Sequence, residues 1–167
     1  ILIAPDKFKG SLTAHQVASA IRRGAKRFDE NINCTILPLA DGGEGSLQVI
    51  QNILNLKQIE VKVKDPLGKT ITSYYLQKGK EVYIELALSS GLQLLKIADQ
   101  NPLLTSTIGT GQKICHAIEN GAKVIHLFLG GSATNDAGIG ISSALGYVFK
   151  DKKGKPLPTI GASLAQV

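Results

Sequence analysis

The stretch VIHLFLGGSATNDAG, residues 124–138, decides the fold class of this chain. It begins with the near-continuous apolar run Val124–Leu129, which is typical of a parallel strand buried on both faces. A loop rich in glycine and small polar residues follows, and Ile141, Leu145 and Val148 then recur at helical spacing. A strand, a glycine-rich loop and an amphipathic helix in this order indicate an α/β protein.

The same pattern occurs twice in the first 56 residues. Strand Ile1–Ala4 precedes a loop, and Thr13 with Gln16 then predicts a capping box at a helix start. The predicted buried face of this helix is Val17, Ile21, Ala25 and Phe28. Strand Thr35–Leu39 precedes loop Ala40–Gly45 and a helix. The inward residues of that helix are Leu47, Ile50, Ile53 and Leu54.

Residues 59–104 follow a different period. Ile59, Val61 and Val63 alternate with charged residues, and two further strands, Thr70–Gln77 and Glu81–Leu86, are predicted after turns. Helical spacing resumes after Gly111, and the last stretch to Val167 predicts one more helix. We expect a parallel α/β domain made of residues 1–58 and 105–167. Residues 59–104 would form a smaller antiparallel β lobe or insertion.

The composition is that of a globular protein, since 43% of the residues are hydrophobic and 19% are charged. No apolar run approaches the roughly 20 residues of a membrane helix, and no secretory signal pattern precedes Ile1–Ala4. Two cysteines are too few for a disulfide framework. We therefore expect a cytoplasmic protein that binds no membrane. Part of the net charge of +6 lies on the polar face of a predicted helix, at Arg22–Arg27, without interleaved aromatic residues, so nucleic-acid binding is not expected.

The loop Gly130–Gly138 predicts a phosphate-binding site. Its position between a strand end and a helix start favours anions, because the first turn of a helix has unpaired N–H groups and a partial positive charge. Glycines allow the backbone to approach a ligand closely. The neutral donors are Ser132, Thr134 and Asn135, and Asp136 is the only carboxylate. The alternative interpretation is that one of these residues only caps the following helix.

The two earlier loops carry charges. Asp41 and Glu44 would repel a phosphate, so they suit a cation or a substrate hydroxyl that needs a hydrogen-bond acceptor or base. Favourable pairing with the helix dipole is the alternative. Lys7 and Lys9 suit a transferring phosphoryl group or a carboxylate, with solvated lysines as the alternative.

Familiar nucleotide-binding motifs do not fit the chain. Gly68-Lys69-Thr70 is similar to the end of a P-loop, but Val63 stands where the first glycine belongs. Two Gly-x-Gly pairs lack the third glycine of a dinucleotide fingerprint, since Ile114 and Ser143 occupy those places. Any phosphoryl transfer would therefore use a different scaffold.

Four blocks of the chain resemble signatures of the bacterial-type glycerate kinase family. Residues 4–12 read APDKFKGSL where the family usually has APDSFKGSL, and residues 38–45 read PLADGGEG. Residues 85–111 contain ELA, SGL, NPL and GTG, and GGSATND starts at Gly130. The blocks span nearly the whole chain in the family's order. The chain thus resembles the N-terminal part of such a kinase.

The resemblance implies ATP-dependent, Mg²⁺-assisted phosphorylation of D-glycerate to phosphoglycerate, with the 2-hydroxyl favoured over the 3-hydroxyl. It also implies a flavodoxin/Rossmann-like parallel sheet with helices on both faces, and it leaves a homodimer open. Because Lys7 departs from the family pattern, Lys9 is the expected catalytic lysine. Asp41 and Asp136 are the other expected catalytic residues, with exchangeable roles, and Asp136 or else Asp41 would hold Mg²⁺.

The expected substrate- and phosphate-binding residues are Asp6, Lys7, Ser11, Gly42, Gly43, Glu44, Thr107, Gly130, Gly131, Ser132, Thr134 and Asn135. Two competing interpretations remain. One is a non-catalytic α/β domain that binds an anionic metabolite, and the other is an oxidoreductase that uses a dinucleotide.

Overall fold

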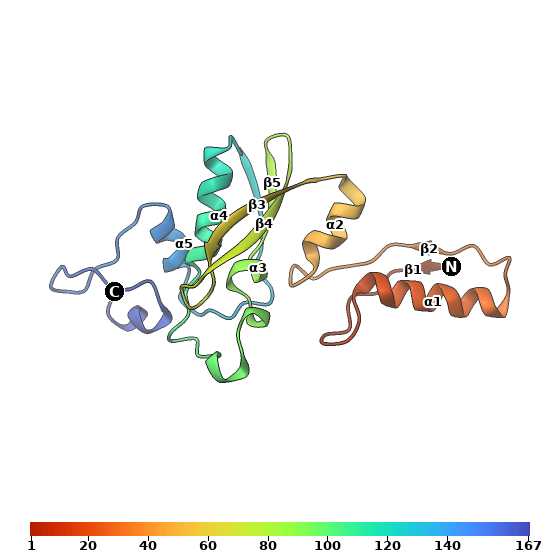
Figure 1. The fold of residues 1–167 in the computed structure, drawn as a ribbon, viewed down its shortest axis with the longest axis horizontal. Helices are drawn as coiled ribbons and strands as arrows, with labels where there is room; N and C mark the ends of the chain where they lie inside the picture. Colours follow the sequence, from red (N-terminus) through yellow and green to blue (C-terminus); the bar gives the residue numbers. More distant parts are fainter.

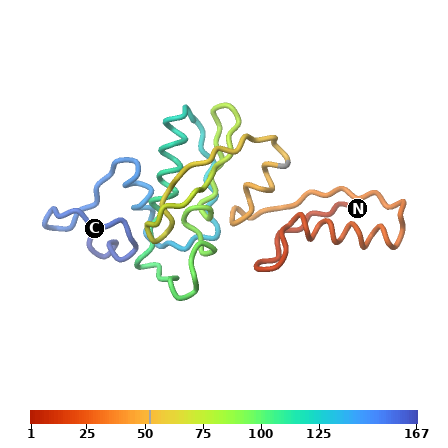
Figure 2. Tube along the Cα trace, in the orientation of Figure 1, coloured from red at the N-terminus to blue at the C-terminus, as the bar shows by residue number. Residues whose placement is uncertain are grey.

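The N-terminal unit is a small parallel βαβ arrangement. The computed structural model describes residues 1–167, apart from the side chain of Asn52. Strand β1 (Leu2–Ile3) pairs in parallel with β2 (Thr35–Ile36), and helix α1 (Ala14–Phe28) connects them. Figure 1 shows this unit at one end of an elongated molecule. Figure 2 follows the chain from there to the C-terminus near the opposite end.

Helix α1 starts as its sequence predicts, but its apolar face is less buried than expected. The capping box is confirmed: Thr13 Oγ1 accepts the Gln16 N–H at 3.3 Å, and Gln16 Oε1 accepts the Thr13 N–H at 2.8 Å. Val17 is buried, whereas Ile21 is exposed and Phe28 is 90% exposed. The prediction of Ile21 and Phe28 as buried residues is wrong because two strands of only two residues each cannot cover a helix of 15 residues.

The core is a four-stranded mixed sheet with the strand order β3-β4-β5-β6. Strands β3 (Lys57–Lys64), β4 (Thr70–Lys78) and β5 (Glu81–Glu85) form the expected antiparallel meander. Strand β6 (Val124–Phe128) adds to β5 in parallel. The expected α/β class is therefore confirmed, but β6 extends the meander instead of pairing with β1 or β2 in the described residues.

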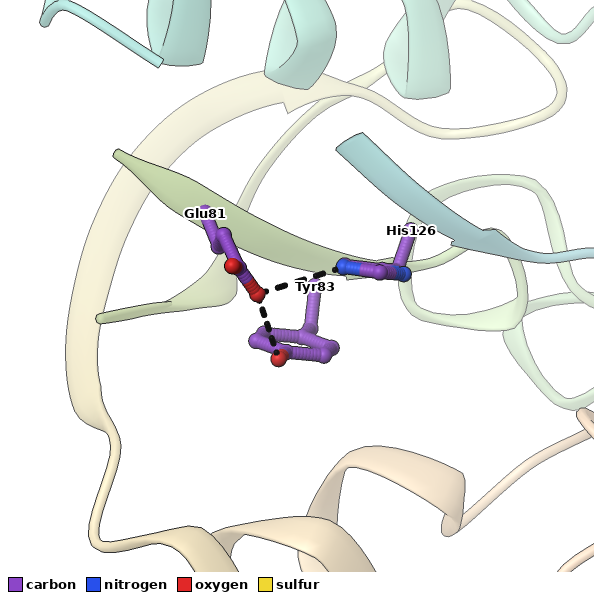
Figure 3. Close-up of polar contacts among 3 residues, drawn as sticks. All are labelled: Glu81, Tyr83 and His126. Atoms are coloured by element: carbon purple, nitrogen blue, oxygen red, sulfur yellow. Dashed lines mark hydrogen bonds and ion pairs between the residues drawn. The ribbon is translucent and has the colours of Figure 1, made fainter. Parts of the chain in front are cut away.

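Cross-strand side chains help to explain why β6 pairs with β5. Tyr83 and His126 are register partners, and their rings stack with centroids 4.5 Å apart. Glu81 Oε2 accepts a hydrogen bond from the Tyr83 hydroxyl at 3.1 Å and lies 3.5 Å from His126 Nε2 (Figure 3). Such cross-strand pairs stabilise one register over its alternatives.

Helices cover both faces of this sheet (Figure 1). Helix α4 (Ile108–Glu119) packs through Ile114 and Ala117 on one face, and α2 (Ser46–Leu54) packs through Leu47 on the other. The short helix α5 (Ile139–Ala144) packs against α4.

The remaining segments are short. They are helix α3 (Ala87–Ser90) and the 3₁₀ turns η1 (Leu92–Leu94), η2 (Ile97–Asp99) and η3 (Gly161–Ala165). The predicted C-terminal helix is thus only a 3₁₀ turn. Leu145 and Val148 are exposed, not inward, because α5 ends at Ala144 and Gly146 takes a left-handed conformation with φ 101°. No helix in the described part of the chain is both long and apolar enough to cross a membrane.

Candidate active site

Two of the glycine-rich loops touch each other beside the ends of β5 and β6. The Gly130 N–H donates a hydrogen bond to the Gly42 carbonyl at 2.8 Å. A Cβ atom on Gly130 would lie only 2.6 Å from the Gly43 Cα and 2.8 Å from the Gly43 nitrogen. Only glycine at position 130 permits this approach of two backbones. The loop Ala40–Gly45 and the loop Gly130–Gly138 thus form one continuous surface.

Asp41 is an exposed carboxylate held by its own loop. Its Oδ1 accepts the Gly43 N–H at 2.9 Å. This hydrogen bond and the positive charge of Lys7 hold the pKa of Asp41 below its ordinary value. The carboxylate is therefore ionised at neutral pH, and it suits the orientation of a hydroxyl better than the permanent uptake of a proton.

Lys7 reaches the same loop from the N-terminal unit. Its Nζ donates a hydrogen bond to the Glu44 carbonyl. A Cβ placed on Gly43 would lie 3.6 Å from Lys7 Nζ and 2.9 Å from Asp41 Oδ1, so the cation and the carboxylate lie close together beside the same glycine. Lys9, the lysine that the family pattern favours, is exposed and exerts a weaker electrostatic effect on Asp41 than Lys7 does.

A cavity of about 650 Å³ opens between the N-terminal unit and helix α2. The site residues that line it include Asp6, Lys7, Lys9, Ser11 and Glu44. Arg22 also lines it and adds a third positive side chain to the two lysines. The volume lies within the range of small-ligand sites, and the cations favour an anionic ligand.

The loop Gly130–Gly138 divides into an open half and a buried half. In the open half, Gly131 and Asn135 are exposed, and Ser132 Oγ lies 2.8 Å from Thr134 Oγ1. The loop is anchored to the end of α3 and to the segment that follows it, because the Leu92 N–H donates to the Gly131 carbonyl at 3.0 Å and the Ala133 N–H to the Ser90 carbonyl at 2.8 Å. The open half can therefore present hydroxyl and amide groups to a phosphate.

Asp136 lies in the buried half, and its side chain is only 1% exposed. Its Oδ2 accepts three hydrogen bonds, from the Thr107 N–H at 2.8 Å, the Thr107 hydroxyl at 2.8 Å and the Gly140 N–H at 3.2 Å. Its Oδ1 accepts a fourth, from the Gly138 N–H at 3.1 Å. A carboxylate has about four lone-pair sites, so this set satisfies it. The geometry gives Asp136 and Thr107 a structural role in joining the starts of α4 and α5.

The carboxylates of the two loops fit an Mg²⁺ site only in part. No cluster of three or more His, Cys, Asp or Glu side chains suited to a metal occurs among the described residues. Mg²⁺ that arrives with a nucleotide needs only one or two carboxylates, because phosphate oxygens and water complete its octahedron. Asp41 and Glu44, which are both exposed, fit that requirement. The engaged oxygens of Asp136 do not.

Sequence reasoning missed a role for Glu85 and Lys113. Glu85 is 1% exposed at the end of β5, and Lys113 is 0% exposed on α4. The signal was present, since Glu85 directly follows the apolar residues Val82–Ile84 and Lys113 precedes the inward-facing Ile114. Neither pattern reveals which groups a buried charge will contact.

The fold and the loops define an α/β protein in which two glycine-rich loops meet beside the ends of two parallel strands. Comparison with known proteins gives the family. The profile of the Glycerate kinase family matches residues 1–167, so the chain belongs to that family.

Individual relatives agree with the family assignment. A protein named glycerate kinase from Halalkalibacterium halodurans is 44% identical over 169 residues, which cover 100% of this chain and 44% of that protein. A protein named glycerate 2-kinase from Escherichia coli is 38% identical over 98% of this chain and 44% of its own length. The crystal structure of a putative glycerate kinase 2 from Salmonella typhimurium matches with a TM-score of 0.79 and 38% identity, over 99% of this chain and 45% of that one. The chain therefore spans less than half the length of these relatives, and it shares the fold of the matched part of the Salmonella structure.

Proposed function

We propose that the protein is an ATP-dependent kinase that phosphorylates D-glycerate, with the 2-hydroxyl as the favoured acceptor. The observation that carries this proposal is the placement of Lys7 and Asp41 beside the same glycine, Gly43, with the Gly130 loop in contact. A cation, an ionised acceptor and an open row of donors are what phosphoryl transfer to an alcohol requires, since that reaction needs mainly positioning and charge neutralisation.

In the proposed reaction, Asp41 accepts a hydrogen bond from the substrate hydroxyl and orients its oxygen. That oxygen forms a bond to the γ-phosphorus of ATP, while the bond from the γ-phosphorus to the bridging oxygen breaks and ADP leaves. The hydroxyl proton passes through Asp41 to solvent, because its lowered pKa does not favour retention of the proton.

The remaining loop residues neutralise negative charge. Lys7 and Lys9 line the cavity, where one would face the glycerate carboxylate and the other the transferring phosphoryl group. Gly131, Ser132, Thr134 and Asn135 would donate hydrogen bonds to phosphate oxygens. Mg²⁺ supplies charge neutralisation on the phosphates when it is bound, and Asp41 with Glu44 would hold it. Asp136 and Thr107 hold the Gly130 loop in place through their mutual hydrogen bonds.

Transfer of labelled γ-phosphate from ATP to D-glycerate, measured with the full-length protein, tests the proposal. We expect a labelled product that ³¹P NMR identifies as 2-phosphoglycerate. A product labelled at the 3-hydroxyl would still support a glycerate kinase, but its acceptor would be the 3-hydroxyl and not the 2-hydroxyl. Tight binding of glycerate or ATP without any labelled product would favour a non-catalytic binding protein. A cytoplasmic location belongs to the same proposal and is tested by cell fractionation.

A further inference from the structure

Glu85 contacts the start of helix α2 across the core. Its Oε1 accepts the Gly45 N–H at 3.1 Å, and its Oε2 accepts the Leu47 N–H at 3.0 Å. The carboxylate is almost completely buried. A charge removed from water is retained only where strong hydrogen-bond partners replace the solvent. The N–H groups of Gly45 and Leu47 are such partners.

Helix α2 has no cap of its own. Its N-cap residue is Gly45, which has φ 88° and no side chain that could accept a hydrogen bond. The first N–H groups of a helix need acceptors, and a negative charge there is favoured by the helix dipole. Glu85, 40 residues further along the chain, provides both.

The capped turn continues directly into the candidate active site. The Ser46 hydroxyl donates to the Gly43 carbonyl at 2.6 Å, and the Gly43 N–H donates to Asp41 Oδ1 at 2.9 Å. The Glu44 carbonyl, within the same turn, accepts the hydrogen bond from Lys7. Glu85 is thus connected through the backbone of one short loop to the side chains of Asp41 and Lys7.

Lys113 lies close to Glu85 and partly compensates its charge: burial raises the pKa of Glu85, and the positive charge of Lys113 acts against that rise. Its Nζ donates a hydrogen bond to the backbone carbonyl of Glu85 at 2.7 Å. Both side chains are buried, one from α4 and the other from β5, so the pair joins these elements beneath α2.

We propose that Glu85 is a positioning residue: its carboxylate fixes the loop Asp41–Gly45 on the sheet and thereby places Asp41 and Lys7 for reaction. This inference rests on the proposed kinase function for its effect on turnover. Glutamine cannot replace Glu85, because it has one acceptor oxygen and would turn its NH₂ group towards an N–H.

Three variants of the full-length protein separate positioning from simple charge compensation. Glu85→Gln removes the double acceptor, and the double variant Glu85→Gln/Lys113→Met also removes the buried positive charge. Ile84→Val is the matched control, because Ile84 is the buried neighbour of Glu85 on the opposite face of β5, under α4. Urea midpoints, kcat, KM for both substrates and amide exchange of residues 43–49 are measured for each.

We expect Glu85→Gln to lower kcat on the order of 10- to 100-fold, as expected for displaced reacting groups, and to change the KM for ATP far less. Amide exchange at Gly45 and Leu47 should accelerate relative to amides of β4, and in Ile84→Val it should not. The double variant should regain the urea midpoint of the parent protein, while its kcat should stay as low as that of Glu85→Gln.

Two results would overturn the inference. One is unchanged exchange at Gly45 and Leu47 in Glu85→Gln, and the other is recovery of kcat together with stability in the double variant, which would make Glu85 a charge partner only. The exchange measurement needs no turnover. If the parent protein has no glycerate-dependent activity, the proposed function fails while exchange still decides whether Glu85 anchors the loop.

Discussion

Replacement of Gly130 by alanine is a direct test of the contact between the two loops. The new Cβ would meet the Gly43 Cα at 2.6 Å and the Gly42 carbonyl oxygen at 3.0 Å. Ordinary carbon–carbon contact begins at about 3.5 Å, so the two backbones must separate by about 1 Å. The neighbours are backbone atoms, which cannot turn away as a flexible side chain can. The substitution must therefore move the Asp41 loop away from the Gly130 loop.

Two effects follow from this separation. Overpacking of a well-packed site costs about 1–3 kcal/mol, and loss of the bond from the Gly130 N–H to the Gly42 carbonyl adds roughly 1 kcal/mol. Displacement of reacting groups by about 1 Å lowers turnover on the order of a hundredfold. We expect the loss of kcat to exceed what the fraction of unfolded protein explains.

The assay compares urea unfolding and D-glycerate-dependent kcat with those of Gly24→Ala. Gly24 lies within α1, and a Cβ there meets nothing within 4 Å, so this control should gain about 0.5–1 kcal/mol and keep its turnover. If Gly130→Ala keeps the parent's stability and kcat, the contact between the loops does not set the geometry of the site.

Three further predictions concern charged residues. Asp41→Asn should lower kcat far more than it weakens ATP binding in calorimetry, and near-normal turnover would remove Asp41 from the reaction. Asp136→Asn should cost about 2–4 kcal/mol in urea unfolding, because one amide oxygen cannot accept four donors; a stable but inactive variant would instead indicate a catalytic role. Burial lowers the pKa of Lys113 to about 7, below its value in the unfolded chain. The unfolded state therefore binds more protons than the folded state between these two pKa values, and the free energy of unfolding should rise with pH from about 7 to about 9. Lys113→Met should abolish that rise, and an unchanged pH profile would show that Lys113 does not cause it.

The local parts of the fold were predictable because their signals are local. Alternating residues predicted the meander, and Thr13 with Gln16 predicted the start of α1. The partner of β6 was not predictable, because its apolar run is compatible with any parallel neighbour. Its pairing with β5 depends on contacts such as that between Tyr83 and His126, which lie 43 positions apart.

The candidate site was predictable as a set of loops but not as an arrangement. The position of Gly130 between strand and helix predicts a site at this edge of the sheet, and the contact of Gly130 with Gly43 follows only from the tertiary structure. Asp136 has the residue type of a metal ligand, yet two of its four hydrogen-bond donors belong to Thr107, which lies 29 positions away in the sequence. Glu85 was missed for the same reason.

We expect these loops to form the site of phosphoryl transfer to D-glycerate. The decisive measurement is ADP release by the full-length protein with Mg·ATP, in the presence and absence of D-glycerate. ADP release should depend on D-glycerate and saturate with its concentration. ADP release that is absent, or that is the same without D-glycerate, would rule out the proposed function.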